Sequence, residues 1–366
     1  MDWSESSDFQ DVTENAADII RTAEFPDAEE WIDALHNGHF HAFAAKGGFP
    51  GRLVRHAVFS SSRYLSSFES LQVVDYGGNV PRPVKRYSEH DVEGYQQPDD
   101  FSTPCNRAQF MVWFYLPSIH RLEIWLRDVE ELKAGPPDLS HLESLILARS
   151  TISEQDVPFL LTRAKNLKNL HLGLCHGWAK QPFYEHSDCL AEGLLSVRDT
   201  VERLSIGLDY HPCIHEGLDE ELAKEESRAV LHGIFAQFSR LQTLEVPTTL
   251  LFGFDTIEVD LDDCSILPKT LVDLVLRFDL DNLWWFYWET WSVQDFGASI
   301  MQNLPDFPHL RCILSRSHKR YFRHVRPEDG WQMHQMFKEH GIDFNVVVDS
   351  LGAGLWSSGG SVKLYQ

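Results

Sequence analysis

The sequence predicts an α/β fold in the form of an irregular solenoid, with parallel strands on the inside and helices on the outside. Two observations favour this fold: one short apolar phrase recurs along the chain, and amphipathic helical segments lie between its copies. A third observation concerns residues 1–66, which lack the phrase and contain short helical patterns. We therefore expect an N-terminal helical cap followed by an array of strand–helix units.

The repeated phrase has the form apolar-x-x-apolar-x-apolar, which is typical of leucine-rich repeats. Each copy predicts a short strand with its apolar side chains directed into the solenoid, because successive strand residues point to opposite faces. Several copies are spaced by about the 20–29 residues of regular repeats, and the wider spacings require insertions. The copies are Phe68-Leu71-Val73, Ile119-Leu122-Ile124, Leu142-Leu145-Leu147, Leu167-Leu170-Leu172, Val201-Leu204-Ile206, Leu241-Leu244-Val246, Leu271-Leu274-Leu276 and a degraded Leu310-Ile313.

Helices are predicted between the phrases from start signals and periodicity. Ser153 is a candidate N-cap followed by acidic residues, and Ser292 with Asp295 is a second such start. A third helix begins near Asp188, and a fourth is predicted over Glu220 to Phe238. The apolar faces of the first three helices are Val157, Leu160, Leu161 and Ala164; then Phe296, Ile300 and Leu304; then Leu190, Leu194 and Val197.

The two ends of the array have different compositions. Residues 1–66 form the predicted N-terminal segment, with helices over Ala28 to Leu35 and Leu53 to Leu65. The predicted solenoid covers residues 67–348, contains a long loop at about 77–106, and closes with a strand over Phe344 to Val348. Residues 349–366 are rich in Gly and Ser, and we interpret them as a flexible tail.

The charge and composition exclude several classes of partner. A net charge of −23 makes nucleic acid and anionic membrane surfaces poor partners. The N-terminus lacks a secretion signal, and no apolar stretch reaches the roughly 20 residues needed to cross a bilayer. The 6 cysteines show no paired motif, which is typical of free thiols in a reducing compartment. We therefore expect a cytoplasmic or nuclear protein.

Four segments carry a resemblance to a known family. LPSIHRLEIWL (Leu116 to Leu126), LPKTLVDLVL (Leu267 to Leu276) and FPHLRCI (Phe307 to Ile313) resemble the leucine-rich-repeat region of filamentous-fungal F-box-like proteins. FKEHGIDFNVVV (Phe337 to Val348) resembles their C-terminal helix–strand ending. The resemblance implies a substrate-recognition subunit of a cullin–RING ubiquitin ligase, with a small adaptor protein and substrates as partners. Residues 1–65 depart from the family, because they show no clear F-box.

The expected functional surface consists of the residues that alternate with the apolar positions of the phrases. Their mixed polar character is typical of a surface that meets a polar protein partner. This interpretation makes the chain a non-catalytic protein-interaction scaffold without a cofactor. The predicted partner-binding residues are Arg121, Glu123, Trp125, Asn169, His171, Arg203, Ser205, Thr243, Glu245, Asp273, Val275 and Arg277.

The alternative function is a metal-binding protein or enzyme that uses the His/Cys-rich stretch 171–215. Zinc prefers four nitrogen or sulfur ligands, but the spacing here matches no known finger, so buried thiols and loop histidines are the favoured interpretation. No hydrolase elbow, phosphate-binding loop or metalloprotease motif is present, and we expect no enzyme activity. The candidate ligands are His171, Cys175, His176, His186, Cys189, His211, Cys213 and His215.

Two further segments have both a functional and a structural interpretation. The aromatic run Leu283 to Trp291 could form a binding hot spot, although core packing is favoured for most of its rings. The basic segment Arg311 to Arg326 could hold a phosphorylated or acidic motif. Neutralisation of the chain's own acidic residues is the favoured interpretation of that segment.

Overall fold

The computed structural model describes residues 71–75, 111–124, 126, 128–150, 152–177, 187–211, 231–252, 264–278, 290–318, 327–349 and 362–363, together with Arg21, Glu29 and Ile32. The contacts between residues divide the chain into two units. The first comprises Met1–Gln72 and Gly78–Ser118, and the second comprises Val73–Gly77 and Ile119–Gln366. In the first unit, Arg21, Glu29 and Ile32 are helical, and the 3-10 helix η5 covers Met111–Tyr115.

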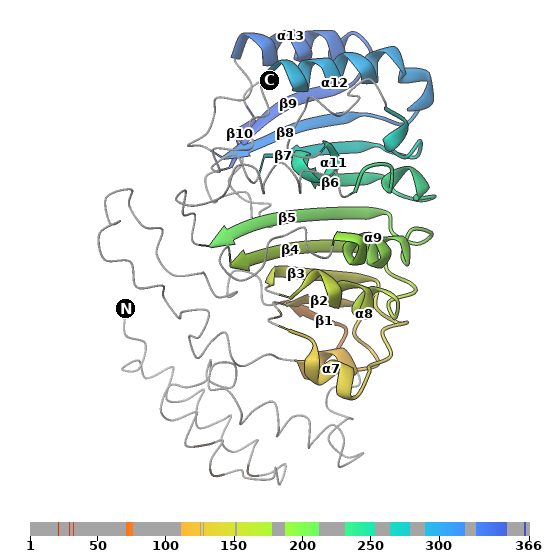
Figure 1. Ribbon diagram of the computed structural model, residues 1–366, viewed down its shortest axis with the longest axis vertical. Coiled ribbons are helices and arrows are strands. Elements are labelled where there is room, and N and C mark those ends of the chain that lie inside the picture. The colour runs from red at the N-terminus through yellow and green to blue at the C-terminus, as the bar shows by residue number, and fades with distance from the viewer. Residues whose placement is uncertain are drawn as a thin grey trace, which may run out of the picture. The chain divides into compact units, whose positions relative to one another are not determined.

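The second unit contains a sheet whose strands follow one another in chain order (Figure 1). Strands β1 to β9 are parallel, and β10 pairs antiparallel with β9. The predicted α/β class with parallel strands is thus confirmed. The strands are β1 (Val73–Asp75), β2 (Arg121–Ile124), β3 (Ser144–Ser150), β4 (Asn169–Gly177), β5 (Arg203–His211), β6 (Thr243–Pro247), β7 (Asp273–Arg277), β8 (Cys312–His318), β9 (Asp343–Asp349) and β10 (Val362–Lys363).

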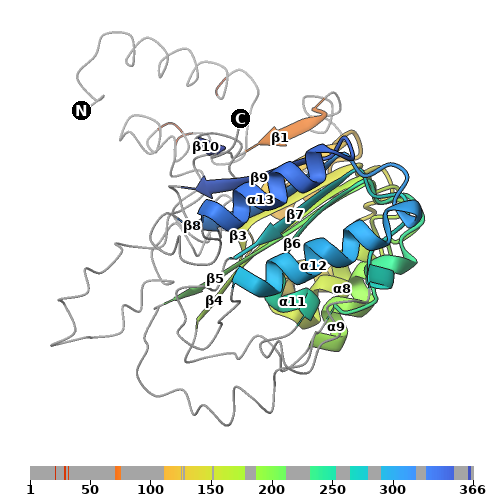
Figure 2. The same cartoon turned by 90° about the horizontal axis from the view of Figure 1, so that it is seen from above.

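Helices connect the strands and lie on one face of the sheet (Figure 2). Parallel neighbours require such crossover connections, because a tight turn can join only antiparallel strands. The described α-helices are α7 (Glu130–Ala134), α8 (Val157–Leu161), α9 (Ser187–Leu195), α11 (Thr248–Phe252), α12 (Thr290–Gln302) and α13 (Pro327–Lys338). The 3-10 helices of this unit are η6 (Glu154–Asp156), η7 (Phe235–Gln237), η8 (Cys264–Ile266) and η9 (Leu304–Asp306).

The core lies between the sheet and these helices, and the repeated phrase builds it. In each phrase the middle apolar residue lies beside the equivalent apolar residue of the next strand. Each of these side chains is at most 2% exposed, and full burial of one such side chain contributes roughly 1.5–3 kcal/mol. The aligned residues are Leu122, Leu145, Leu170, Leu204, Leu244, Leu274, Ile313 and Phe344.

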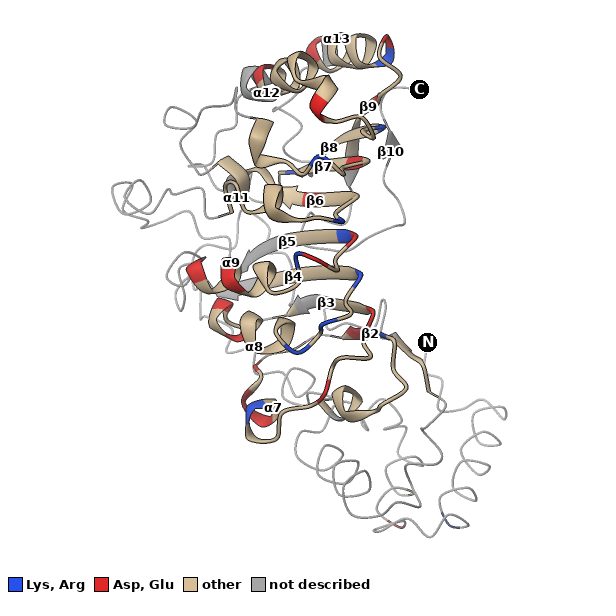
Figure 3. Ribbon diagram, turned by 90° about the vertical axis from the view of Figure 1, so that its right-hand side faces the viewer, with Lys and Arg blue, Asp and Glu red and all other residues tan. Residues whose placement is uncertain are grey.

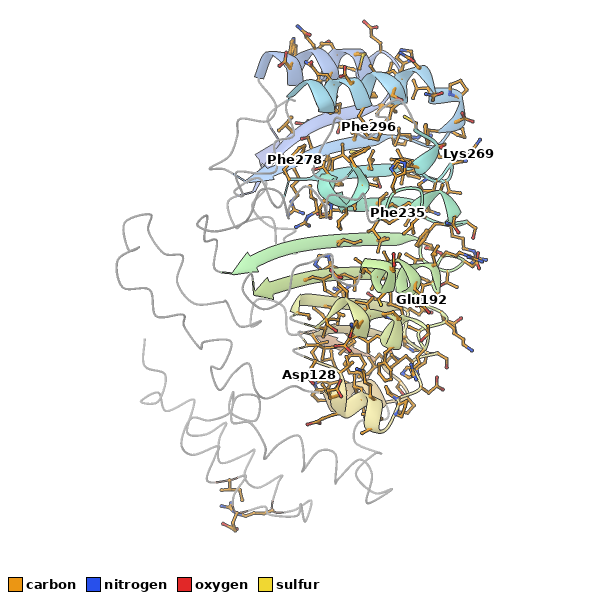
Figure 4. All side chains as sticks on the ribbon, viewed as in Figure 1. Asp128, Glu192, Phe235, Lys269, Phe278 and Phe296 are labelled. Atoms are coloured by element: carbon orange, nitrogen blue, oxygen red, sulfur yellow. The ribbon has the colours of Figure 1, made fainter. Side chains whose placement is uncertain are left out.

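Aromatic rings from the connections complete this core. Phe235, Phe278 and Phe296, which are labelled in Figure 4, are buried. The ring of Phe252 from α11 meets that of Phe296 from α12 edge-on, with 4.8 Å between centroids. Such an edge-to-face pair contributes about 0.5–1.5 kcal/mol beyond the burial of its area. Successive connections are therefore packed against one another as well as against the sheet.

A row of backbone hydrogen bonds aligns the chain at the residue immediately before each of strands β3 to β8. The amide of that residue donates to the carbonyl of the equivalent residue before the preceding strand. These backbone groups are therefore satisfied without side chains, which allows the intervening connections to differ in length. The donors are Glu143, Lys168, Glu202, Gln242, Val272 and Arg311, and their acceptors are His120, Glu143, Lys168, Glu202, Gln242 and Val272.

The predicted register of the first phrase is wrong. The phrase Phe68-Leu71-Val73 placed Val73 inside, but Val74 pairs with Leu122 and is buried, whereas Val73 is 51% exposed. Two adjacent valines allow both registers by apolarity alone, and a shift of one residue exchanges the two faces of a strand. The pairing with β2 selects the register that buries Val74.

The helix predictions are confirmed in part. Val157, Leu160, Leu161 and Ala164 are buried as predicted, as are Leu190, Leu194 and Val197. Ser153 precedes η6 rather than an α-helix and makes no side-chain cap hydrogen bond. Helix α12 begins at Thr290, so Ser292 lies inside it and the predicted N-cap there is wrong. Of Glu220 to Phe238, the described end forms a turn and η7 instead of an α-helix.

The remaining predictions about the chain ends have mixed outcomes. The predicted closing strand is confirmed as β9. Val362–Lys363, within the segment interpreted as a flexible tail, forms β10 and pairs with Val348 and Val347. The loop predicted at 77–106 and the helix predicted over Leu53 to Leu65 lie outside the described residues. Among the residues that are described, no helix has the length and apolarity needed to span a membrane.

The contact between α8 and α9 provides a test of the packing. A Cβ atom added at Gly193 would lie 3.0 Å from Val157 Cγ1 and 3.1 Å from the backbone nitrogen of Pro158. We expect Gly193→Ala to destabilise the protein by about 1 kcal/mol, because overpacking costs more than the gain in helix propensity. Equilibrium denaturation in urea measures this change.

Gly297 in α12 provides the matched control. Its added Cβ would approach only side chains, chiefly the terminal Cε of Met333 at 2.6 Å, and a methionine end can move aside. We expect Gly297→Ala to be neutral or to stabilise the protein by up to about 1 kcal/mol. Equal effects of the two substitutions would contradict the close approach of α9 to α8.

Candidate functional site

The candidate site is the face of the sheet opposite the helices. One residue from each of strands β2 to β9 lies along this face in register, close to where the strands begin. We call this row the outer line. Its members are Arg121, Ser144, Asn169, Arg203, Thr243, Asp273, Cys312 and Asp343.

Solvent reaches most of the outer line. Arg203 and Asp343 are exposed, and Asn169, Thr243 and Asp273 are half-buried. Both signs of charge are visible along the side of the sheet where the strands begin (Figure 3). The alternation of faces that the phrases predict therefore places polar side chains of this row on an accessible surface.

Two side-chain hydrogen bonds within this face hold residues of the outer line. Arg121 Nη2 donates to Glu123 Oε2 at 3.2 Å, and this ion pair spans two successive positions of β2 on the same face. Thr243 Oγ1 donates to Asp273 Oδ2 at 3.2 Å, between β6 and β7. These bonds limit the rotation of Arg121 and Asp273, and thus fix where their charges are presented.

The next residues on this face form a second row, which we call the inner line. It comprises Glu123, Ile146, His171, Ser205, Glu245, Val275, Leu314 and Asn345. Glu123, His171 and Ser205 are buried, and so is Asn345. The predicted binding residues Glu123, His171 and Ser205 therefore do not lie on an open surface. The alternation of polar and apolar residues could not reveal this burial, because it shows on which face of the sheet a residue lies but not whether that residue is buried.

An ion cluster joins Glu245 of the inner line to Arg277 of β7 and Arg316 of β8, which lie on the same face two residues after the inner line. Glu245 Oε1 accepts a hydrogen bond from Arg277 Nη1 at 2.5 Å and another from Arg316 Nη1 at 2.6 Å. Arg277 is 0% exposed, although it was predicted to contact a partner. Its buried ion pair assigns it to the structure of the sheet, and this corrects the prediction for Arg277.

The two arginines also determine the ionisation of Glu245. Burial is the largest single effect and would raise the pKa of this carboxyl, but the charge of Arg277, that of Arg316 and smaller effects together outweigh it. The net effect is a pKa below the usual value, so the carboxylate stays ionised. A carboxylate held in this way is poorly suited to accept a proton from a substrate.

His171 lies close to the same cluster and is electrically neutral at physiological pH. Burial, followed by the positive charge of Arg277, lowers the pKa of its imidazole to about 3. Its Nδ1 is 2.9 Å from Ser205 Oγ, on the neighbouring strand. His171 is thus a buried neutral side chain of the sheet, which differs from its predicted place on an exposed partner-binding surface.

Arg316 is the residue of this cluster that the predicted site did not include. It was grouped with the basic segment, for which neutralisation of the chain's own acidic residues was favoured, and its bond to Glu245 agrees with that interpretation. A sequence signal was available: Arg277 follows Leu274 by the same spacing as Arg316 follows Ile313. The two arginines pair in register between β7 and β8.

Several other predicted features lie largely outside the described residues. Trp125 and the run from Leu283 to Glu289 are among them, as are residues 319–326 of the basic segment. In the His/Cys-rich stretch, Cys189 is a half-buried free thiol on α9. Among the side chains that the structure describes, no group of three or more His, Cys, Asp and Glu residues could hold a metal ion.

Comparison with known protein families finds no match to this chain, and comparison with curated proteins finds none either. The functional proposal therefore depends on the geometry of the sheet and on the sequence pattern that produces it.

Proposed function

We propose that this chain is a non-catalytic protein-interaction scaffold, built as an irregular leucine-rich-repeat solenoid that works in the cytoplasm or nucleus. The solenoid is supported by the in-register alignment of the phrase positions from Leu122 to Phe344 and by strands that neighbour one another in chain order. Connections of different lengths between equivalent strands agree with repeats that carry insertions.

One observation carries the binding role: the outer line is polar, continuous over strands β2 to β9, and accessible over most of its length. Arg203 is exposed at the middle of the line, between half-buried Asn169 and Thr243. Arginine with neighbouring amide and hydroxyl groups is common where protein interfaces are polar.

The binding role predicts that the outer arginines affect partner binding and not folding. We expect Arg121→Ala combined with Arg203→Ala to reduce recovery of partner proteins at least about tenfold, since loss of a central interface arginine often costs 2 kcal/mol or more. Arg203→Ala is also assayed alone, because Arg121 pairs with the buried Glu123. This single variant should keep the unfolding temperature within about 2 °C of the unchanged protein, because exposed substitutions usually change stability by less than 0.5 kcal/mol. Quantitative affinity purification from the native cells measures the first effect.

The control variant removes two cations from the helical side of the sheet. Lys165 follows α8, Lys338 ends α13, and both are exposed. Lys165→Ala combined with Lys338→Ala makes the same change in net charge and should leave recovery of partners unchanged. Equal losses in the two double variants would show that net charge, and not the outer line, controls binding.

A narrower form of the proposal is a substrate-recognition subunit of a cullin–RING ubiquitin ligase. Its support is the resemblance of the repeat phrases to those of filamentous-fungal F-box-like proteins, which is an argument by analogy. The same purification tests it. Recovery of a cullin and a small adaptor with the unchanged protein would support it, and their absence while other partners are recovered would leave only the scaffold.

A further inference from the structure

The charges of the outer line are separated by sign. The exposed cation Arg203 lies on β5, and the carboxylates Asp273 and Asp343 lie on β7 and β9. The register places all three residues at the same level of their strands. A partner that lies across strands β5 to β9 therefore meets one positive charge first and then two negative charges.

The three charges are also evenly spaced, with one strand between each pair. Neighbouring strands lie about 4.8 Å apart, so consecutive charges are separated by about 9.6 Å. A polyproline II helix has three residues per turn and a rise of about 3.1 Å per residue. Every third side chain of such a helix therefore points in the same direction, at intervals of about 9.3 Å, which nearly matches the spacing of the charges.

Other peptide conformations fit this spacing less well. In an extended strand, residues three apart span about 10 Å but point to opposite faces, so they could not meet the three charges together. In an α-helix the nearest repeat on one face is seven residues, or about 10.5 Å, and the mismatch grows to about 2 Å over two steps. The polyproline II mismatch over the same two steps is about 0.6 Å.

We propose that the outer line binds a polyproline II segment of a partner protein in which an acidic residue is separated from two basic residues by steps of three. The acidic side chain contacts Arg203, which can bind a carboxylate through two parallel hydrogen bonds. The basic side chains contact Asp273 and Asp343. This inference depends on the scaffold function proposed above and specifies the chemistry of its partner.

Hydrogen-bonding groups on the two strands next to Arg203 fit the same ligand. A polyproline II backbone has no internal hydrogen bonds, so its carbonyl groups need donors from outside. The side-chain amide of Asn169 lies one strand before Arg203, and the Thr243 hydroxyl lies one strand after it. Asn169 offers donors to a carbonyl of the bound segment, and Thr243 already orients Asp273 at 3.2 Å.

The test uses two seven-residue probes of identical composition. The matching probe carries glutamate at position 1, lysine at positions 4 and 7, and proline elsewhere; the scrambled probe exchanges the glutamate with the first lysine. Both probes have the same net charge, which controls for attraction to a chain of net charge −23. Fluorescence titration at low salt measures both dissociation constants, and a second pair in reverse order allows for the opposite chain direction.

We expect the matching probe, in one of its two directions, to bind at least about tenfold more tightly than its scrambled partner, because like charges that face each other are strongly unfavourable. Arg203→Glu should remove this preference. Because Arg203 is exposed, this variant should fold normally, and Arg203→Gln provides a milder version. Equal binding of matching and scrambled probes, or a preference that survives Arg203→Glu, would overturn the inference.

The outcomes distinguish the inference from the function on which it depends. If Arg121→Ala with Arg203→Ala abolishes recovery of partners but the probes show no preference, the scaffold function stands and the polyproline II ligand is wrong. If that double variant leaves recovery unchanged and the probes also show no preference, both proposals are wrong.

Discussion

Replacement of Glu245 by Gln should destabilise the protein by about 3–5 kcal/mol, which is the usual cost of removing one partner from a buried ion pair. Glu245 Oε1 accepts from both Arg277 and Arg316, so one substitution removes the negative charge that faces two guanidinium groups. Glutamine has nearly the same shape, so the effect reports on charge rather than on volume. Chemical denaturation at pH 7 measures it.

Two comparisons identify the buried cluster as the source of this loss. Glu143 and Lys168 form an exposed ion pair at 3.0 Å, and Glu143→Gln should change stability by less than about 1 kcal/mol. Replacement of Glu245, Arg277 and Arg316 together by apolar residues of similar size should cost far less than Glu245→Gln, because no buried charge is left unbalanced. A small effect of Glu245→Gln would show that this carboxylate is not buried between the arginines.

His171 should make the protein less stable as the pH falls below about 6.5. Burial, followed by the charge of Arg277, lowers the pKa of its imidazole to about 3 in the folded chain. Between these two values the unfolded chain binds the proton and the folded chain does not, so stability rises with pH across this window. From pH 7.5 to pH 5.0 the expected loss is about 2 kcal/mol.

His171→Gln should remove this part of the pH dependence while keeping a side chain that can bond to Ser205. Stability curves of the two proteins would then converge between pH 7.5 and pH 5.0. Glu245 acts at lower pH: its pKa lies below the ordinary value, so its contribution is complete above about pH 4.5 and is lost below the folded-state value. Parallel curves for the original protein and His171→Gln would contradict the burial of a neutral His171.

Much of the fold could be predicted from the sequence because the core has a simple period. Leu145, Leu170 and Leu204 each occupy the same phrase position, and burial of one face allows only one register. Where the apolar signal was ambiguous, as at Val73 and Val74, the prediction was wrong. The start of α12 was missed as well, because Ser292 is a good N-cap by residue type but lies inside the helix.

The site could be predicted only at the level of the face. Alternation placed Arg203 and His171 on the same side of the sheet, but one is exposed and the other is 1% exposed. Local pattern cannot distinguish them, because burial of the inner line depends on contacts between residues distant in the chain. Arg316 was missed for a different reason: its basic neighbours in sequence concealed that it shares a register position with Arg277.

The central claim is that a partner protein contacts the outer line. Site-specific photo-crosslinking tests it most directly, with the crosslinking residue placed at half-buried Asn169 of the outer line and, in a separate protein, at exposed Gln302 of α12 on the helical side. We predict protein adducts from position 169 in native cells, few from position 302, and loss of the former when Arg203→Ala is added. Adducts from position 302 without adducts from position 169 would contradict the claim and assign recognition to the helices.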